Sequence, residues 1–462
     1  MKTFTLATAA SSLISTVLAA PSLQARDDIT PITVKGNAFF KGDERFYIRG
    51  LDYQPGGSSD LADPITDVKG CKRDIPKFKE LGVNTIRVYS VDNSKDHDEC
   101  MNALADAGIY LVLDVNTPKY SINRSKPKES YNDVYLQYIF ATVDKFAKYK
   151  NTLAFFSGNE VINDGPSSSA APYVKAVTRD LRQYIRSRGY RKIPVGYSAA
   201  DVESNRLQMA EYMNCGTEDQ RSDFFAFNDY SWCDPSSFTK SGWDKKVEKF
   251  SHYGLPLFLS EYGCNTNKRD FGEVHALYSE KMTPVYSGGL VYEYSQESSN
   301  YGLVKIDGGN VKELDDFSAL AKAFKNTPNP EGDGGYNKTA GGNPCPAKNA
   351  PSWDVDSGDE LPAIPEPAKK YMKEGAGKGK GFSGSGSQNA GTQSTGTAEP
   401  GSASVPSDGA SSSGSGSGSS SSESGSSGAA AGLKVPPMSF APLFIGMVTV
   451  LSGFFGASLI LV

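Results

Sequence analysis

Short apolar runs recur along the first two thirds of the chain, and stretches with helical periodicity lie between most of them. Segments 135–148 and 173–187 are clear examples of the helical pattern. Alternation of short strands with helices is typical of parallel βα units, and residues 21–330 have the length of one barrel. We therefore expect an α/β protein with a (β/α)8 TIM-barrel fold. The eight expected strands contain residues 46–48, 85–88, 110–113, 153–156, 193–196, 224–227, 257–259 and 290–292.

The two ends of the chain have a different hydrophobic profile. Residues 1–19 begin with Lys2, continue as an Ala/Leu/Ser/Thr-rich run and end in small residues, which is typical of a secretory signal peptide. No charged residue lies in 439–462, and this apolar tail follows small residues and a short spacer. That order predicts a GPI-attachment signal at 429–462, with the anchor on Gly428. A retained tail-anchor helix is the alternative, and the signal peptide argues against it.

Two polar stretches separate the expected barrel from the tail. Residues 331–382 are rich in Pro and Gly and contain Cys345, so we expect an irregular extension tethered to the barrel through that cysteine. Residues 383–428 are mostly Ser, Gly, Thr and Ala and cannot bury enough apolar surface to offset chain entropy. We expect a disordered stalk there. The expected domain that carries the function is the barrel, residues 20–330.

Charge and composition exclude several classes of protein. The chain has 48 Lys and Arg against 53 Asp and Glu, a net charge of −5, so no basic field exists to bind nucleic acid. It has three His, and its six Cys form no Cys-x-x-Cys pair, so neither a metal site nor a cofactor is expected. An exported chain meets an oxidising compartment, where the six Cys are expected to pair.

Polar residues follow almost every expected strand. In a barrel the carboxyl ends of the strands form the functional face, so these side chains are expected to meet in one cleft. Amides, carboxylates and phenols with few cations suit a neutral polyhydroxylated ligand rather than a phosphate. The residues are Asp52, Gln54, Tyr89, Asp114, Asn159, Glu160, Asp201, Asn228, Tyr230, Glu261, Tyr292 and Glu293.

Two of these carboxylates form a candidate catalytic pair. Glu160 follows the fourth expected strand and Glu261 follows the seventh, and those strands face each other across a barrel mouth. Retaining glycosidases place an acid/base and a nucleophile about 5–5.5 Å apart. Asn159, directly before Glu160, could donate a hydrogen bond to a sugar 2-hydroxyl. The pair predicts glycoside chemistry with retention.

The segments around these residues resemble glycoside hydrolase family 72, the fungal GPI-anchored β-1,3-glucanosyltransferases of the cell wall. The resemblance covers about residues 28–350 and rests on the motifs at 52–57, 85–90, 156–161, 228–233, 259–264 and 291–295. It implies cleavage within a β-1,3-glucan and transfer of the new reducing end, through a covalent intermediate, to the non-reducing end of another β-1,3-glucan. It assigns Glu160 as acid/base and Glu261 as nucleophile.

The resemblance also implies binding residues and disulfides. Six Cys allow fifteen connectivities, and the resemblance selects Cys71–Cys100, Cys215–Cys345 and Cys233–Cys264. Some members carry a Cys-rich carbohydrate-binding module after the barrel, but no Cys follows Cys345 in this sequence, so we expect this chain to lack the module. The implied glucan-binding residues are Gln54, Tyr89, Asp114, Asn159, Asp201, Arg206, Tyr230 and Tyr292.

Two other functions remain open at this point. An endo-β-1,3-glucanase would use the same glutamates, whereas a non-catalytic glucan-binding wall protein would not need both. Asn123 and Asn337 begin glycosylation sequons, which fits export. We expect a monomer at the cell surface, held on the outer leaflet of the plasma membrane by the GPI anchor, with β-1,3-glucan as donor and acceptor.

Overall fold

The computed structural model describes residues 29–57, 61–339, 341–356 and 360–403. The expected signal peptide, most of the expected stalk and the expected GPI signal lie outside these residues. In the part of the chain that is described, no helix combines the length and apolar character needed to cross a bilayer.

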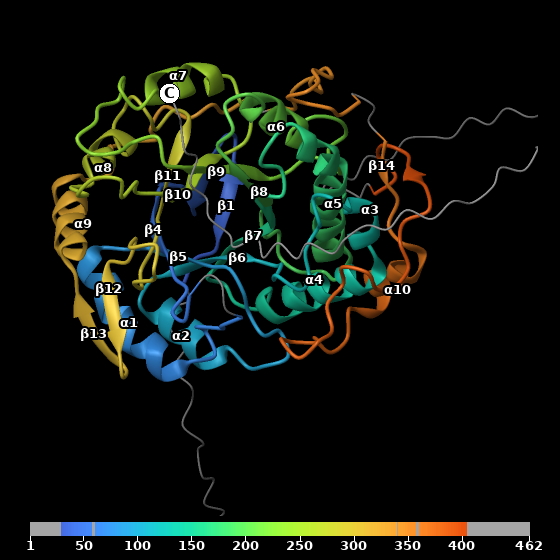
Figure 1. Cartoon of the computed structure of the whole chain (residues 1–462), viewed down its shortest axis with the longest axis horizontal. Coiled ribbons are helices and arrows are strands. Elements are labelled where there is room, and N and C mark those ends of the chain that lie inside the picture. The colour runs from blue at the N-terminus through green and yellow to red at the C-terminus, as the bar shows by residue number, and fades with distance from the viewer. Residues whose placement is uncertain (1–28, 58–60, 340, 357–359, 404–462) are drawn as a thin grey trace, which may run out of the picture. The chain divides into compact units, whose positions relative to one another are not determined.

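Eight parallel strands close into a barrel in sequential order, and the last of them pairs with the first (Figure 1). This confirms the TIM-barrel fold that the alternating pattern predicted. The strands are β4 (Ile48–Asp52), β5 (Thr85–Val88), β6 (Tyr110–Asp114), β7 (Thr152–Asn159), β8 (Val195–Ala200), β9 (Phe224–Asp229), β10 (Leu257–Tyr262) and β11 (Tyr286–Val291).

Helices surround the strands, as expected for βα units (Figure 1). Side-chain caps begin two of them: Asp67 accepts from the backbone N–H of Gly70 in α1, and Asn132 accepts from that of Tyr135 in α4. The segments with predicted helical periodicity, 135–148 and 173–187, correspond to α4 and α5. The helices are α1 (Val68–Leu81), α2 (Asp98–Asp106), α3 (Pro127–Ser130), α4 (Asp133–Phe146), α5 (Ala171–Ser187), α6 (Arg206–Met213), α7 (Trp243–Phe250), α8 (Gly272–Leu277) and α9 (Asp315–Asn326).

The first and last barrel strands are displaced from their predicted positions. β4 starts at Ile48 and includes Arg49 and Asp52, two buried charged residues that interrupt the apolar pattern. β11 begins at Tyr286 and contains Gly288, whose φ is +87° and whose added Cβ would lie 2.2 Å from the carbonyl oxygen of Ile48. Where β11 pairs with β4, the close approach of the two backbones therefore determines the residue type more than hydrophobicity does.

A three-stranded antiparallel sheet packs under the amino ends of the barrel strands. It consists of β1 (Ile32–Lys35), β2 (Ala38–Lys41) and β3 (Glu44–Phe46). Phe39 of this sheet contacts Phe224 and Phe258 of the barrel interior, with ring centroids 6.1 and 5.9 Å apart. These residues belong to one buried cluster, so the barrel axis is a packed core with a closed floor.

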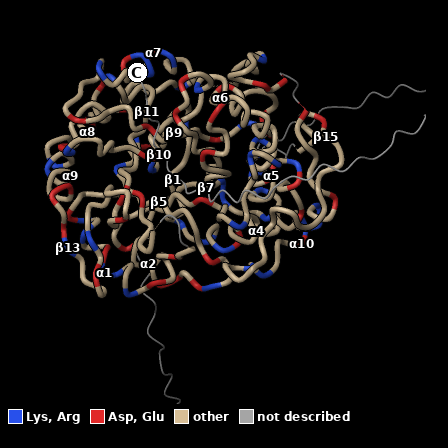
Figure 2. Tube along the Cα trace, viewed as in Figure 1, with Lys and Arg blue, Asp and Glu red and all other residues tan. Residues whose placement is uncertain are grey.

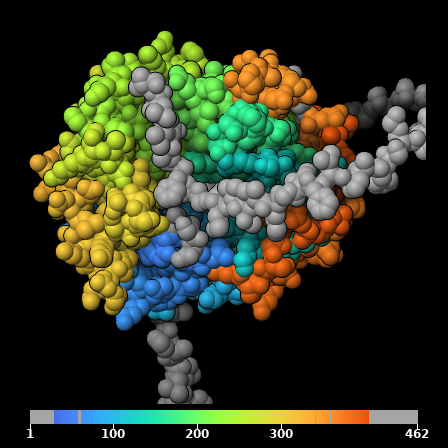
Figure 3. Space-filling view, in the orientation of Figure 1, coloured from blue at the N-terminus to red at the C-terminus, as the bar shows by residue number. Residues whose placement is uncertain are grey.

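The chain after the barrel differs from the predicted boundary at residue 383. Residues 383–403, expected in the stalk, continue along the barrel beside α4 and α5, and β15 (Thr397–Ala398) pairs with β14 (Leu361–Pro362) (Figures 1 and 3). This segment lacks large apolar side chains, but its backbone and small polar groups hydrogen-bond to the barrel loops. Composition alone did not reveal those partners. Two short helices precede β15, η2 (Glu366–Ala368) and α10 (Lys369–Glu374), and the hairpin β12 (Val304–Asp307) and β13 (Asn310–Glu313) follows the barrel.

The six cysteines form the three disulfides that the resemblance implied. Cys71–Cys100 joins α1 to α2, Cys215–Cys345 ties the extension to the loop after α6, and Cys233–Cys264 joins the loops after β9 and β10. Lys and Arg alternate with Asp and Glu over the described trace (Figure 2). The mixture is consistent with the small net charge.

Candidate active site

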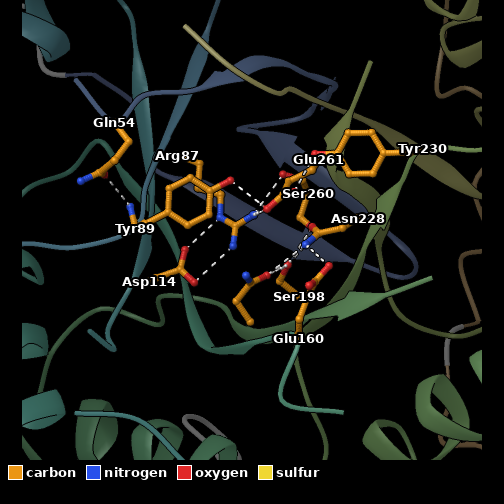
Figure 4. Close-up of polar contacts among 11 residues, drawn as sticks. Gln54, Arg87, Tyr89, Asp114, Glu160, Ser198, Asn228, Tyr230, Ser260 and Glu261 are labelled. Carbon is orange, nitrogen blue, oxygen red and sulfur yellow. Dashed lines mark hydrogen bonds and ion pairs between the residues drawn. The ribbon is translucent and has the colours of Figure 1, made fainter. Parts of the chain in front are cut away.

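The two predicted glutamates lie at the carboxyl end of the barrel. Glu160 directly follows β7, the fourth barrel strand, and Glu261 lies in β10, the seventh. Asn228 and Ser260 lie between the two side chains, and dashed contacts connect this group (Figure 4). The structure therefore brings together the pair that the strand pattern predicted.

Glu261 is held in one orientation by three donors. Its Oε1 accepts from the Tyr89 hydroxyl at 2.9 Å and from Nη1 of Arg87 at 3.2 Å. Its Oε2 accepts from the Tyr230 hydroxyl at 2.7 Å. The side chain is only 11 % exposed, so little of the carboxylate is open to solvent.

The surroundings of Glu261 shift the pKa of its carboxyl to near neutral pH. Burial raises the pKa of the Glu261 carboxyl to about 7, against the opposing effect of the Arg87 guanidinium. The charge of Glu160 adds to the rise in pKa, and the hydroxyls of Tyr230 and Tyr89 oppose it. The cation and the phenols thus keep a buried carboxylate available as an anion.

Arg87 is a site residue that the sequence analysis did not identify. It is fully buried on β5, donates from Nε and Nη2 to the two oxygens of Asp114 at 2.9 and 3.2 Å, and lies between Asp114 and Glu261 (Figure 4). Its guanidinium also stacks on the Tyr89 ring, 4.2 Å from the centroid. The available signal was an arginine between two apolar residues of an expected strand. A cation buried there requires anionic partners, so its presence predicts carboxylates nearby.

Glu160 adopts an unusual backbone conformation for a residue with a side chain. Its φ is +47°, in the left-handed region. Its backbone N–H donates to the carbonyl oxygen of Ser198 at 2.9 Å, and its carbonyl oxygen accepts from Nη2 of Arg124 at 2.6 Å. Nδ2 of Asn228 donates to its Oε1 at 2.9 Å. The neighbours thus fix both the backbone and the carboxylate.

Asn228 connects the surroundings of both glutamates. Its Nδ2 also donates to Oδ1 of Asn159 at 3.2 Å, while its Oδ1 accepts from Oγ of Ser260 at 2.8 Å. Ser198 donates to the Asn159 and Asn228 oxygens at 2.7 and 3.1 Å. The sequence analysis placed Asn228 after its strand but did not assign it a role, and it missed Ser198 and Ser260. All three residues lie near the carboxyl ends of adjacent strands, and this position was the available signal in the sequence.

The predicted binding residues fall into two groups. Gln54, Tyr89, Asp114, Asn159, Tyr230 and Tyr292 lie on or directly after barrel strands around the glutamates. Within this group Gln54 orients the loops, because its Oε1 accepts from the N–H of Tyr89 and its Nε2 donates to the carbonyl of Ala62. Tyr230 and Tyr292 meet edge to face with ring centroids 6.3 Å apart, and Tyr301 joins them as a third ring not anticipated from the sequence.

Asp201 and Arg206 form the second group, after β8. They pair with each other, and Nζ of Lys246 bonds Asp201 and Asp229 at 2.6 Å each. Asp201 and Arg206 are therefore engaged in ion pairs and are less available to bind a sugar than the sequence suggested. Lys246 was not anticipated.

Two further carboxyls, Asp52 and Glu293, are buried near Glu261. Burial raises the pKa of Asp52 well above its usual range, against the effect of Arg87. Burial also raises the pKa of Glu293 to about 9, and a hydrogen bond with Glu297 adds to the rise. Glu293 is therefore a neutral acid over much of the physiological range.

Glu293→Gln is expected to change how stability depends on pH. The folded state binds the Glu293 proton more tightly than the unfolded chain, whose pKa is 4.5, so this stabilisation is lost as pH rises toward 9. The variant should match the wild type at pH 5 and exceed its free energy of unfolding by about 1–3 kcal/mol at pH 8. Urea denaturation at both pH values measures this, with the exposed Glu99→Gln as control. If the free energy of unfolding differed between wild type and Glu293→Gln by the same amount at both pH values, the prediction would be wrong.

The two sequons lie in different surroundings. The side chain of Asn123 is half-buried, and its Nδ2 donates to Oε1 of Gln388 at 3.0 Å. The side chain of Asn337 is also half-buried, and its Oδ1 accepts from the N–H and hydroxyl of Thr339. We retain glycosylation at both as a proposal.

The arrangement can perform double displacement on a glycoside. One carboxylate is buried, oriented and paired with a cation, while a second is fixed by the Asn228 amide on β9. Among the described residues no cluster of His, Cys, Asp and Glu has the form of a metal site. The side chains at the mouth are carboxylates, amides and phenols, which are the groups that bind sugar hydroxyls and stack on sugar rings.

Comparisons with known proteins agree with this site. Residues 21–328 match the glycoside hydrolase family 72 model, described as glucanosyltransferase. The chain is 81% identical over 447 residues to the Aspergillus fumigatus 1,3-beta-glucanosyltransferase gel1, covering 97% of each chain. It is 54% identical to Schizosaccharomyces pombe 1,3-beta-glucanosyltransferase gas4, covering 78% of this chain and 81% of that protein.

A solved structure shows the same fold with oligosaccharides bound. Saccharomyces cerevisiae Gas2p, in a mutant form in complex with laminaritetraose and laminaripentaose, is 39% identical and superposes with a TM-score of 0.68. The match covers 74% of this chain and 76% of that one. The family match, the relatives and the shared fold lead to one conclusion: this chain belongs to the glucanosyltransferase family, glycoside hydrolase family 72.

Proposed function

We propose that this chain is a β-1,3-glucanosyltransferase that acts with retention, with Glu160 as acid/base and Glu261 as nucleophile. The observation that carries the proposal is Glu261, a buried carboxylate oriented by Arg87, Tyr89 and Tyr230 beside a second fixed glutamate. The names of the relatives support transfer, and the laminari-oligosaccharides bound to Gas2p support β-1,3-glucan as the substrate class.

The first half-reaction cleaves the donor within its chain. A carboxylate oxygen of Glu261 attacks the anomeric carbon, and Glu160 donates its proton to the glycosidic oxygen of the departing fragment. The other fragment stays bound as a glycosyl ester of Glu261. Glu160 has then given up its proton and is a carboxylate, so it can act as the base in the next step.

The second half-reaction joins this fragment to an acceptor. Glu160, now a carboxylate, takes the proton from the hydroxyl at the acceptor's non-reducing end, and that oxygen displaces Glu261 from the anomeric carbon. Water competes at about 55 M, so transfer needs an acceptor held at high effective molarity. The rings of Tyr230, Tyr292 and Tyr301 lie beside Glu261 and offer apolar surfaces that could bind the acceptor and displace water.

A reduced laminari-oligosaccharide of defined length is expected to yield products longer than the donor. Double displacement makes the new linkages β, and attack by the 3-hydroxyl at the acceptor's non-reducing end makes them 1,3. Chromatography of the products over time, followed by linkage analysis, measures this. Products that are only shorter than the donor, at every acceptor concentration, would identify an endo-β-1,3-glucanase instead.

We also propose that the barrel acts at the cell surface. The support is in the sequence: residues 1–19 have the features of a signal peptide, and 429–462 those of a GPI-attachment signal with Gly428 as the anchored residue. The barrel then works as a tethered monomer within the wall.

Phosphatidylinositol-specific phospholipase C is expected to release the protein from membranes of the producing cell. The released chain should end near Gly428, and intact-mass measurement with C-terminal peptide mapping tests this. Recovery of peptides from Phe440 onward in the mature protein would contradict the anchor.

A further inference from the structure

The backbone of Glu160 depends on a residue outside the barrel strands. A non-glycine residue at φ +47° is strained and persists only where its neighbours fix it. Ser198 on β8 accepts from its N–H, and Asn228 on β9 binds its carboxylate. The remaining contact is from Arg124, whose Nη2 donates to the Glu160 carbonyl at 2.6 Å.

Arg124 lies in a long loop between β6 and α4. The loop turns sharply at Asn123, whose Oδ1 accepts from the N–H groups of Ser125 and Lys126 at 3.0 and 3.2 Å. Arg124 is half-buried in this turn. The position of the guanidinium therefore follows the position of the turn.

Residues 382–393, which we name the C-terminal strap, hold this loop from outside. Gln388 binds both sides of the turn: its Nε2 donates to the carbonyl of Ser121 at 2.9 Å, and its Oε1 accepts from Nδ2 of Asn123 at 3.0 Å. The N–H of Ser387 donates to the Lys119 carbonyl at 3.0 Å, and Nζ of Lys119 donates to the Phe382 carbonyl at 2.9 Å.

The strap is also fixed to the start of α4. Nδ2 of Asn132 donates to the Ser387 carbonyl at 2.7 Å, and the N–H of Asp133 donates to the Thr392 carbonyl at 3.1 Å. The loop is thus bound between α4 and the strap, with Arg124 directed inward to Glu160. Figure 3 shows the orange-to-red C-terminal segment lying against the teal part of the barrel.

We propose that Arg124 is a positioning residue for the acid/base Glu160, and that the C-terminal strap maintains it through Gln388. The inference rests on the proposed function. Without Arg124 the Glu160 carbonyl loses a charge-assisted hydrogen bond, and the left-handed conformation loses one of its restraints. The carboxyl then samples positions from which it protonates the leaving oxygen poorly, and a shift of about 1 Å can cost about a hundredfold in rate.

Two donors distinguish this role from a merely structural one. A reduced laminari-oligosaccharide needs protonation of its leaving oxygen, whereas an aryl β-laminari-oligoside with a dinitrophenolate leaving group departs without it. The quantity to measure is kcat/KM on the oligosaccharide divided by kcat/KM on the aryl donor. Incompletely folded enzyme lowers both values equally and cancels from the ratio.

Arg124→Ala is expected to lower kcat/KM on the oligosaccharide by about tenfold or more while changing the aryl donor by less than about threefold. Arg124→Lys, which keeps a cationic donor, should recover part of the ratio. Lys126→Ala, an exposed lysine in the same turn, is the matched control and should leave the ratio unchanged. An unchanged ratio in Arg124→Ala would overturn the positioning role.

Gln388→Ala tests the strap without altering Arg124. It should shift the ratio in the same direction by about threefold, because the turn is loosened rather than removed. Gln393→Ala is its control, since this second glutamine of the strap makes no side-chain hydrogen bond within the described part of the chain. An unchanged ratio for Gln388→Ala would overturn the role of the strap. A wild-type enzyme inactive on both donors would instead refute the proposed function.

Discussion

Glu261→Gln is expected to lower kcat by at least about a thousandfold while leaving the fold intact. The substitution keeps the volume and the hydrogen-bonding shape but removes the anion that must attack the anomeric carbon. Glu160→Gln should lose about 10²–10⁴ in rate on oligosaccharide donors, because the leaving oxygen is then unprotonated. Initial rates on reduced laminari-oligosaccharides and thermal melting of each variant measure both effects.

Added azide separates the two roles. In Glu160→Ala an activated aryl donor still forms the glycosyl ester, and azide should release it as a product of retained configuration. Glu293→Gln is the matched control, since Glu293 is a buried carboxyl near Glu261 that takes no part in the mechanism. If either Glu160→Gln or Glu261→Gln kept more than about a tenth of wild-type activity, the assignment would be wrong.

Arg87→Met is expected to lower the free energy of unfolding by about 3–5 kcal/mol, because Asp114 and Glu261 would remain buried without their cation. The same substitution should alter the pH profile. Arg87 lowers the pKa of Glu261, so its loss raises that pKa further and reduces the ionised fraction at any given pH. The limb on which kcat/KM rises with pH should therefore move to higher pH.

Arg45→Met is the control for this second effect. Arg45 donates to the Thr283 carbonyl and the Ser287 hydroxyl under the floor of the barrel, far in the fold from the strand ends that carry the glutamates. It should lower stability and leave the pH profile in place. Urea denaturation and pH–rate profiles measure both variants, and a normal profile for Arg87→Met would show that Arg87 only stabilises the fold.

Periodicity predicted the barrel and its central strands well. The expected strand at 110–113 lies within β6, because a strand buried on both faces reads as a continuous apolar run. Glu160 and Glu261 were predictable for the same reason: each follows such a run, and the order of strands fixes which side chains meet. Reasoning of this kind needs only the sequence and the geometry of a closed sheet.

The remaining site residues depend on contacts between distant parts of the chain. Arg87 lies within an apolar run, and its partners Asp114 and Glu261 lie 27 and 174 residues further along the chain. Gln388 lies in a Ser/Gly-rich stretch whose composition is typical of disorder, yet it binds Ser121 and Asn123, more than 260 residues earlier. No local pattern encodes such pairs, because their hydrogen bonds form only when the barrel has closed.

The closed floor of the barrel limits how a polymer can be processed. Phe39 and its neighbours fill the lower end of the axis, so a glucan chain cannot thread through the molecule. A bound polymer must lie across the mouth, with both of its ends free. Attack by Glu261 then does not need a chain end, and any glycosidic bond that lies between the two glutamates can be cleaved. Between cleavages the enzyme can leave one glucan chain and bind another, so we expect dispersed cleavage of many glucan chains rather than processive shortening of one.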